Sequence, residues 1–382
     1  LGNIATNGGA ITLIGANFSL NQNIDAGAGA ISLAKAQNNT ALSTTQISDT
    51  EIDRLLTTGT LTLGRATTAG AAGTGGGNML TASTFTATAA ISNAGATGIF
   101  SIIANDGVTL NQSLTTNRAT TINADADAND NTGNLTIANT RTLNTSNKTL
   151  SITANDLALN SSGKINSGTA STSIIDSDNS GIGLGAATVS NGLNITGAEL
   201  QLITANGLEL RTGGNLTVNG ISAANSNNIG GATTLTANGG ASTITFATGA
   251  STFNKLSATA TGNITTSVNL TSDVSSLSLI STTGNLTLGG NIAASGGGDA
   301  IVRTRRRCAA PPRHDEIRPG VCGKPWAGTS RPRRLGNSHR GGWGGDPWSD
   351  RAGEARENEV ASESRDDAGN RMRSRLGPRE ME

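Results

Sequence analysis

The chain has 382 residues, a net charge of zero, 51 glycines, only 2 % aromatic residues and no tyrosine. An ordinary globular core needs more bulky side chains than this, and a disordered chain would carry more charge and more proline. The class that fits is a repetitive fold in which each unit buries a few aliphatic residues against the next.

Composition changes abruptly near residue 302. Residues 1–300 contain no proline, cysteine, tryptophan or histidine, and residues 301–382 contain all of them. The first part has 9 basic and 15 acidic residues, a net of −6, and the second has 18 and 12, a net of +6. The acidic first part offers no basic patch for nucleic acid. We therefore divide the chain into a repeat region, 1–302, and a tail, 303–382.

Pairs of large aliphatic residues, separated by one residue, recur through the repeat region. Residues i and i+2 share one face of a strand, and the residue between is usually Thr, Ser or Asn, which suits a solvated face. Each pair predicts a short strand. In chain order the pairs are Ile11/Leu13, Phe18/Leu20, Ile31/Leu33, Leu61/Leu63, Val108/Leu110, Leu135/Ile137, Leu150/Ile152, Leu157/Leu159, Leu193/Ile195, Leu200/Leu202, Leu208/Leu210, Leu216/Val218, Ile244/Phe246, Leu277/Leu279 and Leu286/Leu288.

The spacing of these pairs predicts the architecture. Several start seven or eight residues apart, as at Leu193, Leu200 and Leu208, which is a short strand plus a tight turn made by Gly and Asn. An antiparallel sandwich or barrel fits this spacing, and so does a solenoid with coils of roughly 20–25 residues. A sandwich would use more aromatic residues and would protect its edges with proline or charge. We therefore predict an all-β parallel β-helix of about 13 coils, with asparagine ladders at its corners.

Longer phrases also repeat. An Ala-Asn step precedes a strand pair at Asn17, Asn105, Asn155 and Asn206, and the last three lie 50 and 51 residues apart. This distance is about two coils, so it predicts a duplication unit of two coils.

The phrase Gly-Asn-Leu-Thr occurs three times, in Gly133-Asn-Leu-Thr-Ile137, Gly214-Asn-Leu-Thr-Val218 and Gly284-Asn-Leu-Thr-Leu-Gly-Gly-Asn-Ile292. These three segments resemble the repeats of filamentous-haemagglutinin-type bacterial exoproteins. The resemblance covers most of residues 1–300. It implies a right-handed parallel β-helix that acts as the non-catalytic shaft of a large adhesin, secreted or held at the bacterial outer membrane. It also implies export through an outer-membrane transporter, by two-partner secretion or as an autotransporter, and partners among the glycans or proteins of host or neighbouring cells.

Two features of that family are missing from residues 1–300. They contain no Asn-Pro motif of a secretion domain and no aromatic-rich strands of a membrane barrel. We therefore expect an interior fragment of the shaft, without a membrane-spanning segment. Two other functions stay open: a β-helical carbohydrate-active enzyme and an S-layer-like structural protein.

The best candidates for acid–base catalysis are Asp49, Glu51 and Asp53, which alternate on one face of a strand beside Arg54. The alternative is a solvated insertion, because residues 34–56 interrupt the strand rhythm. The repeat region has no His, Tyr or Trp, and its carboxylates are scattered. We favour the insertion and predict no catalytic residue, no cofactor and no enzymatic activity.

Two acidic segments could hold a cation. Asp176-Ser-Asp178-Asn-Ser-Gly181 opens like a calcium loop, but Ala187 stands where a bidentate glutamate is needed. Asp125, Asp127 and Asp130 form the densest acidic group, with Asp130 at the position of the required glycine. We predict polar turns and no metal site at both, and a weak cation contact stays open.

Other charged or glycine-rich positions are assigned structural roles. Gly181-Ile-Gly183-Leu-Gly185 lacks the lysine and the helix of a phosphate loop, so we predict a flexible turn. We expect Arg118, Arg141, Lys148 and Arg211 to solubilise the fold or protect strand edges.

From Arg303 onward the recurring aliphatic pairs stop and the composition of the chain differs from that of the repeat region. The basic run of the tail, 303–307, suggests binding to nucleic acid or an anionic surface. Its cysteines and histidines, Cys308, His314, Cys322 and His339, suggest a metal site, although no Cys-x-x-Cys spacing occurs. Its Arg-, Gly- and Pro-rich composition lacks hydrophobic periodicity. We predict a disordered tail that arises from out-of-frame translation and binds no nucleic acid.

Overall fold

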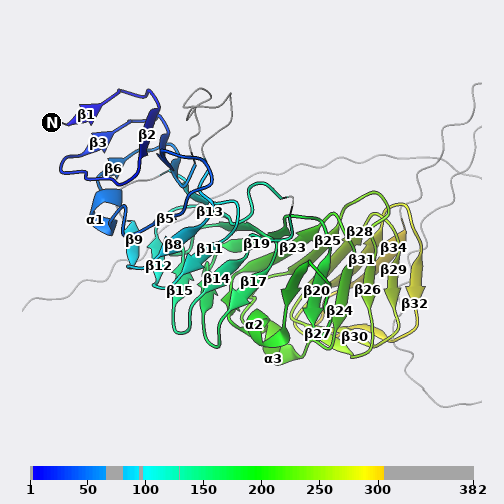
Figure 1. Cartoon of the computed structure of the whole chain (residues 1–382). Helices are drawn as coiled ribbons and strands as arrows, with labels where there is room; N and C mark the ends of the chain where they lie inside the picture. Colours follow the sequence, from blue (N-terminus) through cyan, green and yellow to red (C-terminus); the bar gives the residue numbers. More distant parts are fainter. Residues whose placement is uncertain (1–2, 66–80, 94–97, 129, 305–382) are drawn as a thin grey trace, which may run out of the picture. The chain divides into compact units, whose positions relative to one another are not determined.

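The computed structural model describes residues 3–65, 81–93, 98–128 and 130–304. In these ranges the chain winds into a parallel β-helix, whose strands lie side by side from coil to coil (Figure 1). The predicted fold is confirmed and the sandwich is wrong. The predicted disorder of the tail lies outside the described residues, except that the last strand continues to Thr304, two residues beyond the predicted boundary.

One sheet of twelve parallel strands, here called the long sheet, runs through all the coils. A coil is the segment from one of its strands to the next. Its strands are β2 (Ile11–Gly15), β4 (Ile31–Lys35), β7 (Leu61–Leu63), β10 (Phe100–Ile103), β13 (Thr120–Asn123), β16 (Leu150–Ala154), β19 (Ser171–Asp176), β23 (Gly207–Thr212), β25 (Thr233–Ala237), β28 (Leu256–Ala260), β31 (Leu277–Ser281) and β34 (Ala300–Thr304).

The coils are of unequal length. Leu256 pairs with Leu277, and Leu277 with Ala300, so regular coils span 21 to 23 residues as predicted. Other coils are longer: Leu61 pairs with Phe100, and Thr172 with Leu208. Because these coils contain insertions, the described residues form twelve strands of the long sheet instead of about thirteen coils.

Shorter sheets close the coils. One consists of β5 (Leu42–Ser43), β8 (Phe85–Ala87), β11 (Val108–Leu110), β14 (Leu135–Ile137) and β17 (Leu157–Leu159). Another consists of β20 (Ile182–Gly185), β21 (Leu193–Ile195), β24 (Leu216–Asn219), β26 (Ile244–Phe246), β29 (Ile264–Thr266) and β32 (Leu286–Leu288). The remaining strands are β1 (Ile4–Ala5), β3 (Ile24–Asp25), β6 (Leu55–Leu56), β9 (Ile91–Asn93), β12 (Leu114–Thr116), β15 (Thr142–Asn144), β18 (Lys164–Asn166), β22 (Ile203–Thr204), β27 (Ser251–Phe253), β30 (Leu270–Ser272) and β33 (Ile292–Ala294).

The core consists of columns of inward-facing side chains that stack in register. In the long sheet one column contains ten residues, each at most 1 % exposed. Such stacking lets small and medium side chains fill a narrow interior without aromatic bulk. The column is Leu33, Leu63, Ile102, Ile122, Ile152, Ile174, Leu210, Leu235, Ala258 and Leu279.

The outward-facing residues of the long sheet form a second column, here called the hydroxyl column. Ten of its twelve positions are Thr or Ser, and the exceptions are Glu209 and Ile301. Ser32, Thr62 and Ser101 are buried, so the prediction of a solvated face is wrong for these three coils. The ten are Thr12, Ser32, Thr62, Ser101, Thr121, Ser151, Ser173, Thr234, Ser257 and Ser278.

Asparagine ladders link successive coils, as predicted. The Asn263 Oδ1 accepts from the Asn285 N–H at 2.8 Å, and the Asn269 Oδ1 accepts from the Asn291 N–H at 3.0 Å. Both bonds join residues 22 positions apart, which is one coil. These bonds satisfy backbone donors at corners, where the sheet ladders are interrupted.

The predicted two-coil duplication is wrong. Asn105 and Asn155 follow strands of the long sheet, whereas Asn206 precedes one. The physical reason is the long coil between β19 and β23, which contains one strand more than a regular coil and a helix, and so shifts the phrase to another corner.

Two aliphatic pairs do not form the predicted strands. Leu200 lies in the short helix α2 (Gly197–Gln201), and Leu202 is its C-cap, because Thr196 and Glu199 form a capping box. Phe18 and Leu20 lie outside the strands but pack, half-buried, against the core.

Replacing a core residue and its outward neighbour tests the assignment of the two faces. We expect Ile152→Ala to lower the free energy of unfolding by about 2–5 kcal/mol, because Ile152 is fully buried between two coils. The half-buried Ser151 on the same strand is the control, and Ser151→Ala should change the stability by less than about 0.5 kcal/mol. Urea denaturation measures both, and equal losses would contradict the assignment.

Candidate functional site

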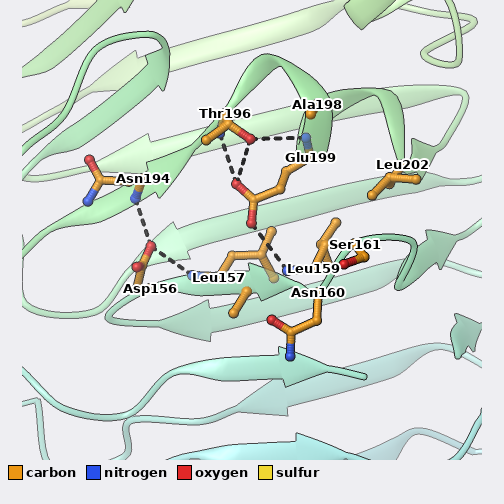
Figure 2. Close-up of a pocket in the computed structure, with 11 residues that line it drawn as sticks. Asp156, Leu157, Leu159, Asn160, Ser161, Asn194, Thr196, Ala198, Glu199 and Leu202 are labelled. Carbon is orange, nitrogen blue, oxygen red and sulfur yellow. Dashed lines mark hydrogen bonds between the residues drawn. The ribbon is translucent and has the colours of Figure 1, made fainter. Parts of the chain in front are cut away.

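The β-helix has a seam where one short sheet ends and another begins. Strand β17 is the last strand of its sheet, and β21 is the first strand of the next, so their facing edges do not pair with each other. A pocket of about 480 Å³ lies here, between β17, β21 and α2 (Figure 2). Its size is in the range of small-molecule sites.

Two carboxylates line the pocket, and each bridges the unpaired edges. The Asp156 Oδ1 accepts from the backbone N–H of Leu157 at 2.9 Å and from that of Asn194 at 2.8 Å. The Glu199 Oε1 accepts from the Leu159 N–H at 3.2 Å, and its Oε2 accepts from the Thr196 N–H at 3.0 Å (Figure 2). Side-chain oxygens therefore replace the carbonyl acceptors that a neighbouring strand would supply.

The seam is acidic. Burial raises the pKa of Asp156; the N–H groups of Asn194 and Leu157 lower it, and the charge of Glu199 raises it further. The lining residues include no Lys, Arg or His. Because both carboxylates already accept from backbone N–H groups, their geometry serves to hold the two sheets together.

Sequence reasoning missed this pair. The Thr196-Gly-Ala-Glu199 phrase is a capping-box signature and could have predicted the helical turn. Asp156 carries no such local signal, because its partner Asn194 is 38 residues away and the break between sheets is a tertiary feature.

A second acidic group brings together the two acidic segments in which the sequence analysis considered a cation site. It contains Asp106, Asp125, Asp127, Asp130 and Asp178 and is here called the aspartate corner. Asp125 is buried, and its Oδ2 accepts from the Ser177 hydroxyl at 2.5 Å. This bond joins the segments that follow β13 and β19, two strands that are separated by β16 in the long sheet. Asp127 and Asp130 are exposed and interact electrostatically with Asp178.

The carboxylates of the aspartate corner disfavour one another's ionisation. Burial raises the pKa of Asp125 to about 6; hydrogen bonds from Ser177 and the Ala128 N–H oppose this, and the charges of Asp178 and Asp127 add to it. Burial, then Asp127 and Asp130, also raise the pKa of Asp106.

Asp176 organises the turn that resembled a calcium loop. It is 1 % exposed, and its Oδ2 accepts from the Gly181 N–H at 2.8 Å and the Thr212 hydroxyl at 2.6 Å. The polar turn predicted here fits this arrangement. In the part of the chain that the structure describes, no three acidic or histidine side chains are placed to hold a metal ion.

The glycine-rich segment that follows is strand β20, so the predicted flexible turn is wrong. A side chain at Gly183 would approach the Ala187 carbonyl oxygen to 2.6 Å. Glycine is needed because the backbones pack closely here.

The acidic trio does not form one face of a strand, because the segment is a helical turn, α1 (Asp49–Ile52). Asp49 accepts from the Ser92 N–H at 2.7 Å, and Glu51 caps the helix and accepts from the Leu20 N–H at 2.8 Å. Burial opposes ionisation of Glu51, but the N–H groups of Ser48 and Leu20 outweigh it and lower its pKa.

The predicted solubilising role is wrong for Arg118, which is 2 % exposed. Its guanidinium carbon lies 5.5 Å from the centre of the Phe100 ring, a cation–π geometry. Burial lowers its pKa to about 10, and the charge of Asp53 opposes this shift. Arg141 and Arg211 are half-buried, and Lys148 is exposed.

Several predicted features lie outside the described residues, namely Cys308, His314, Cys322, His339 and the basic run beyond Thr304. Among the helices that are described, none is long and apolar enough to cross a membrane. No family model, curated protein or solved structure matches the chain.

Removing one bridging carboxylate tests the role of the seam. We expect Asp156→Ala to lower the free energy of unfolding by about 1–3 kcal/mol, because two edge N–H groups lose their acceptor. Asn160 lines the same pocket with an exposed side chain, so Asn160→Ala should cost less than about 0.5 kcal/mol. Urea denaturation measures both variants, and similar stabilities would refute the bridging role.

The aspartate corner predicts a pH-dependent stability. Because the folded-state pKa of Asp125 is raised to about 6, its favourable contribution is complete below pH 4 and is lost as the pH rises through 6. We expect Asp125→Asn to be more stable than the parent by about 1–2 kcal/mol at pH 7.5, with the difference vanishing near pH 4. Urea midpoints between pH 4 and 8 measure this.

Ser177→Ala provides the second arm of this experiment. It removes a hydrogen bond that favours the ionised Asp125, so the pH-dependent loss should move to higher pH. An Asp125→Asn variant that follows the parent at every pH would show that this carboxyl does not cause the dependence.

Proposed function

We propose that the chain is a non-catalytic shaft segment of a large bacterial adhesin, secreted or displayed at the outer-membrane surface. The observation that carries the proposal is the part of the hydroxyl column from Thr121 to Ser278, where half-buried Ser and Thr, with Glu209 among them, lie in register on the outer face of the long sheet. Successive strands are about 4.8 Å apart, so the column is a regular array of hydrogen-bonding groups. An array of this kind suits contact with extended polar partners, such as the glycans or proteins of a cell surface.

The repeat phrases support the same proposal. In the phrases Asn215-Leu-Thr217 and Asn285-Leu-Thr287 the asparagine directly precedes a strand of the β-helix, the fold that the resemblance to filamentous-haemagglutinin-type exoproteins implies. Export through an outer-membrane transporter, by two-partner secretion or as an autotransporter, belongs to this proposal.

A carbohydrate-active enzyme is the second candidate, because the seam pocket contains two carboxylates. Against it stand the hydrogen bonds that Asp156 and Glu199 accept from backbone N–H groups, which tie both carboxylates to the fold. The lining residues also include no aromatic platform for a sugar ring. An S-layer-like structural protein remains a third candidate.

Binding to arrays of cell-surface glycans and immobilised extracellular-matrix proteins tests the proposal. We expect the purified chain to bind at least one of them, and the triple variant Ser151→Arg, Thr234→Arg, Ser257→Arg to lose tenfold or more in affinity, because bulky charges interrupt the hydroxyl column. The control places arginines at Thr109 and Thr136, which are half-buried on a different sheet.

The alternatives predict different results in the same samples. Release of reducing sugar ends from the arrayed glycans, abolished by Glu199→Gln, would replace the adhesin with an enzyme. Ordered two-dimensional lattices in electron micrographs, without binding to either array, would favour the S-layer-like protein.

A further inference from the structure

The edge of β17 that faces the seam keeps its backbone acceptors. The Leu135 N–H of β14 donates to the Asp156 carbonyl oxygen, so the even-numbered residues of this segment pair with β14. Neighbouring residues of a strand direct their backbone groups to opposite sides, so Leu157 and Leu159 face the seam. Their N–H groups are bound by carboxylates, but among the described residues no donor contacts their carbonyl oxygens.

The facing edge of β21 has the same character. The Leu193 N–H donates to the Gly181 carbonyl oxygen on the side of β20, so Asn194 directs its backbone groups to the seam. Asp156 accepts from the Asn194 N–H, and no donor in the described part of the chain contacts the Asn194 carbonyl oxygen. A peptide strand cannot add to either edge, because it needs free N–H groups as well as carbonyl oxygens.

The two carboxylates retain capacity for further hydrogen bonds, since an ionised carboxylate accepts about four. Within the described residues, the Asp156 Oδ1 accepts two and its Oδ2 accepts none. The Glu199 Oε1 accepts one, and its Oε2 accepts from the N–H and the hydroxyl of Thr196. The residues that line the pocket include no Lys, Arg or His. The pocket therefore favours a ligand that brings donors and positive charge.

The strand geometry sets the distance between the two carboxylates. Asp156 and Glu199 accept from N–H groups two residues apart on β17 (Figure 2). A strand advances about 3.3 Å per residue, so the bound oxygens lie roughly 7 Å apart. The pocket is also lined by Ala158, Ala198 and Leu202, which give it apolar surface. A short aliphatic chain with a positive charge at each end fits this arrangement.

We propose that the seam pocket binds a linear aliphatic diamine, or a longer polyamine, whose ammonium groups are about four carbon atoms and ~6 Å apart. An ammonium group has three donors and no acceptor, which complements a site of carboxylates and carbonyl oxygens. One ammonium group donates to Asp156 and to the carbonyl oxygens of Leu157 and Asn194. The other donates to Glu199 and the Leu159 carbonyl oxygen. This inference does not depend on the adhesin function.

Two variants remove the charges and keep the fold. Asp156→Asn and Glu199→Gln each retain a side-chain oxygen that accepts from the backbone N–H groups of the seam. The matched control is Glu209→Gln, because Glu209 lies on the hydroxyl column and accepts from the Ser173 hydroxyl at 2.8 Å. Circular dichroism checks that each variant is folded.

Isothermal titration calorimetry of the full-length chain with 1,4-diaminobutane measures the binding. We expect one diamine to bind per chain, with the same affinity in Glu209→Gln, and each seam variant to lose about tenfold or more in affinity, because a hydrogen bond between two ions is lost. The ligand controls are 1-aminobutane, which has a single ammonium group like a lysine side chain, and the uncharged 1,4-butanediol. Both should bind at least about tenfold more weakly.

Several results would overturn the proposal. One is the absence of saturable binding of the diamine to the folded parent chain. Another is an equal affinity in Asp156→Asn, Glu199→Gln and Glu209→Gln, since binding would then reflect net charge alone. Equal binding of 1-aminobutane would indicate a site for one ammonium group, such as a lysine of a partner protein. The ligand series uses the parent chain, so it decides the question even if a variant does not fold.

Discussion

The whole fold depends on the register of the long sheet. Because every strand pairs in parallel with the next at matching positions, the alternation of in and out within one strand becomes a column through all the coils. A shift of one residue in a single strand would expose its aliphatic side chains and bury its hydroxyls. Leu33 to Leu279 on the inside and Thr12 to Ser278 on the outside are thus two results of one constraint.

Carboxylates maintain this register where strand pairing stops. At the seam, Asp156 and Glu199 accept from N–H groups that have no strand beside them, and at α1 Asp49 and Glu51 do the same for Ser92 and Leu20. At these places the carboxylates of the repeat region are therefore used as hydrogen-bond acceptors for backbone N–H groups. Burying them is tolerable because each carboxylate gains donors in exchange for water.

The strands and their short steps were predictable, since each depends on residues close together in the sequence. The asparagine ladders were predictable because Asn recurs at corners one coil, or 22 residues, apart. The seam and the aspartate corner were not, because both bring together segments that are distant in the sequence: 38 residues apart at the seam and 52 at the aspartate corner. The prediction that Asp49, Glu51 and Asp53 share one face of a strand was wrong. Their spacing by two residues suggests a strand, but Ser48 and Glu51 form a capping box that begins a helix. The glycines from Gly181 to Gly185 suggested a flexible turn, yet close backbone packing in strand β20 requires them.

A solenoid whose coils touch only their neighbours has stability that propagates stepwise, so one segment can open while the rest stays folded. The hydrogen bond between Asp125 and Ser177 is an exception, because it spans 52 residues and bypasses the coil of β16. Opening of that middle coil strains a bond between the coils on either side. These three coils should therefore unfold as one cooperative block, a long-range coupling in an otherwise one-dimensional molecule.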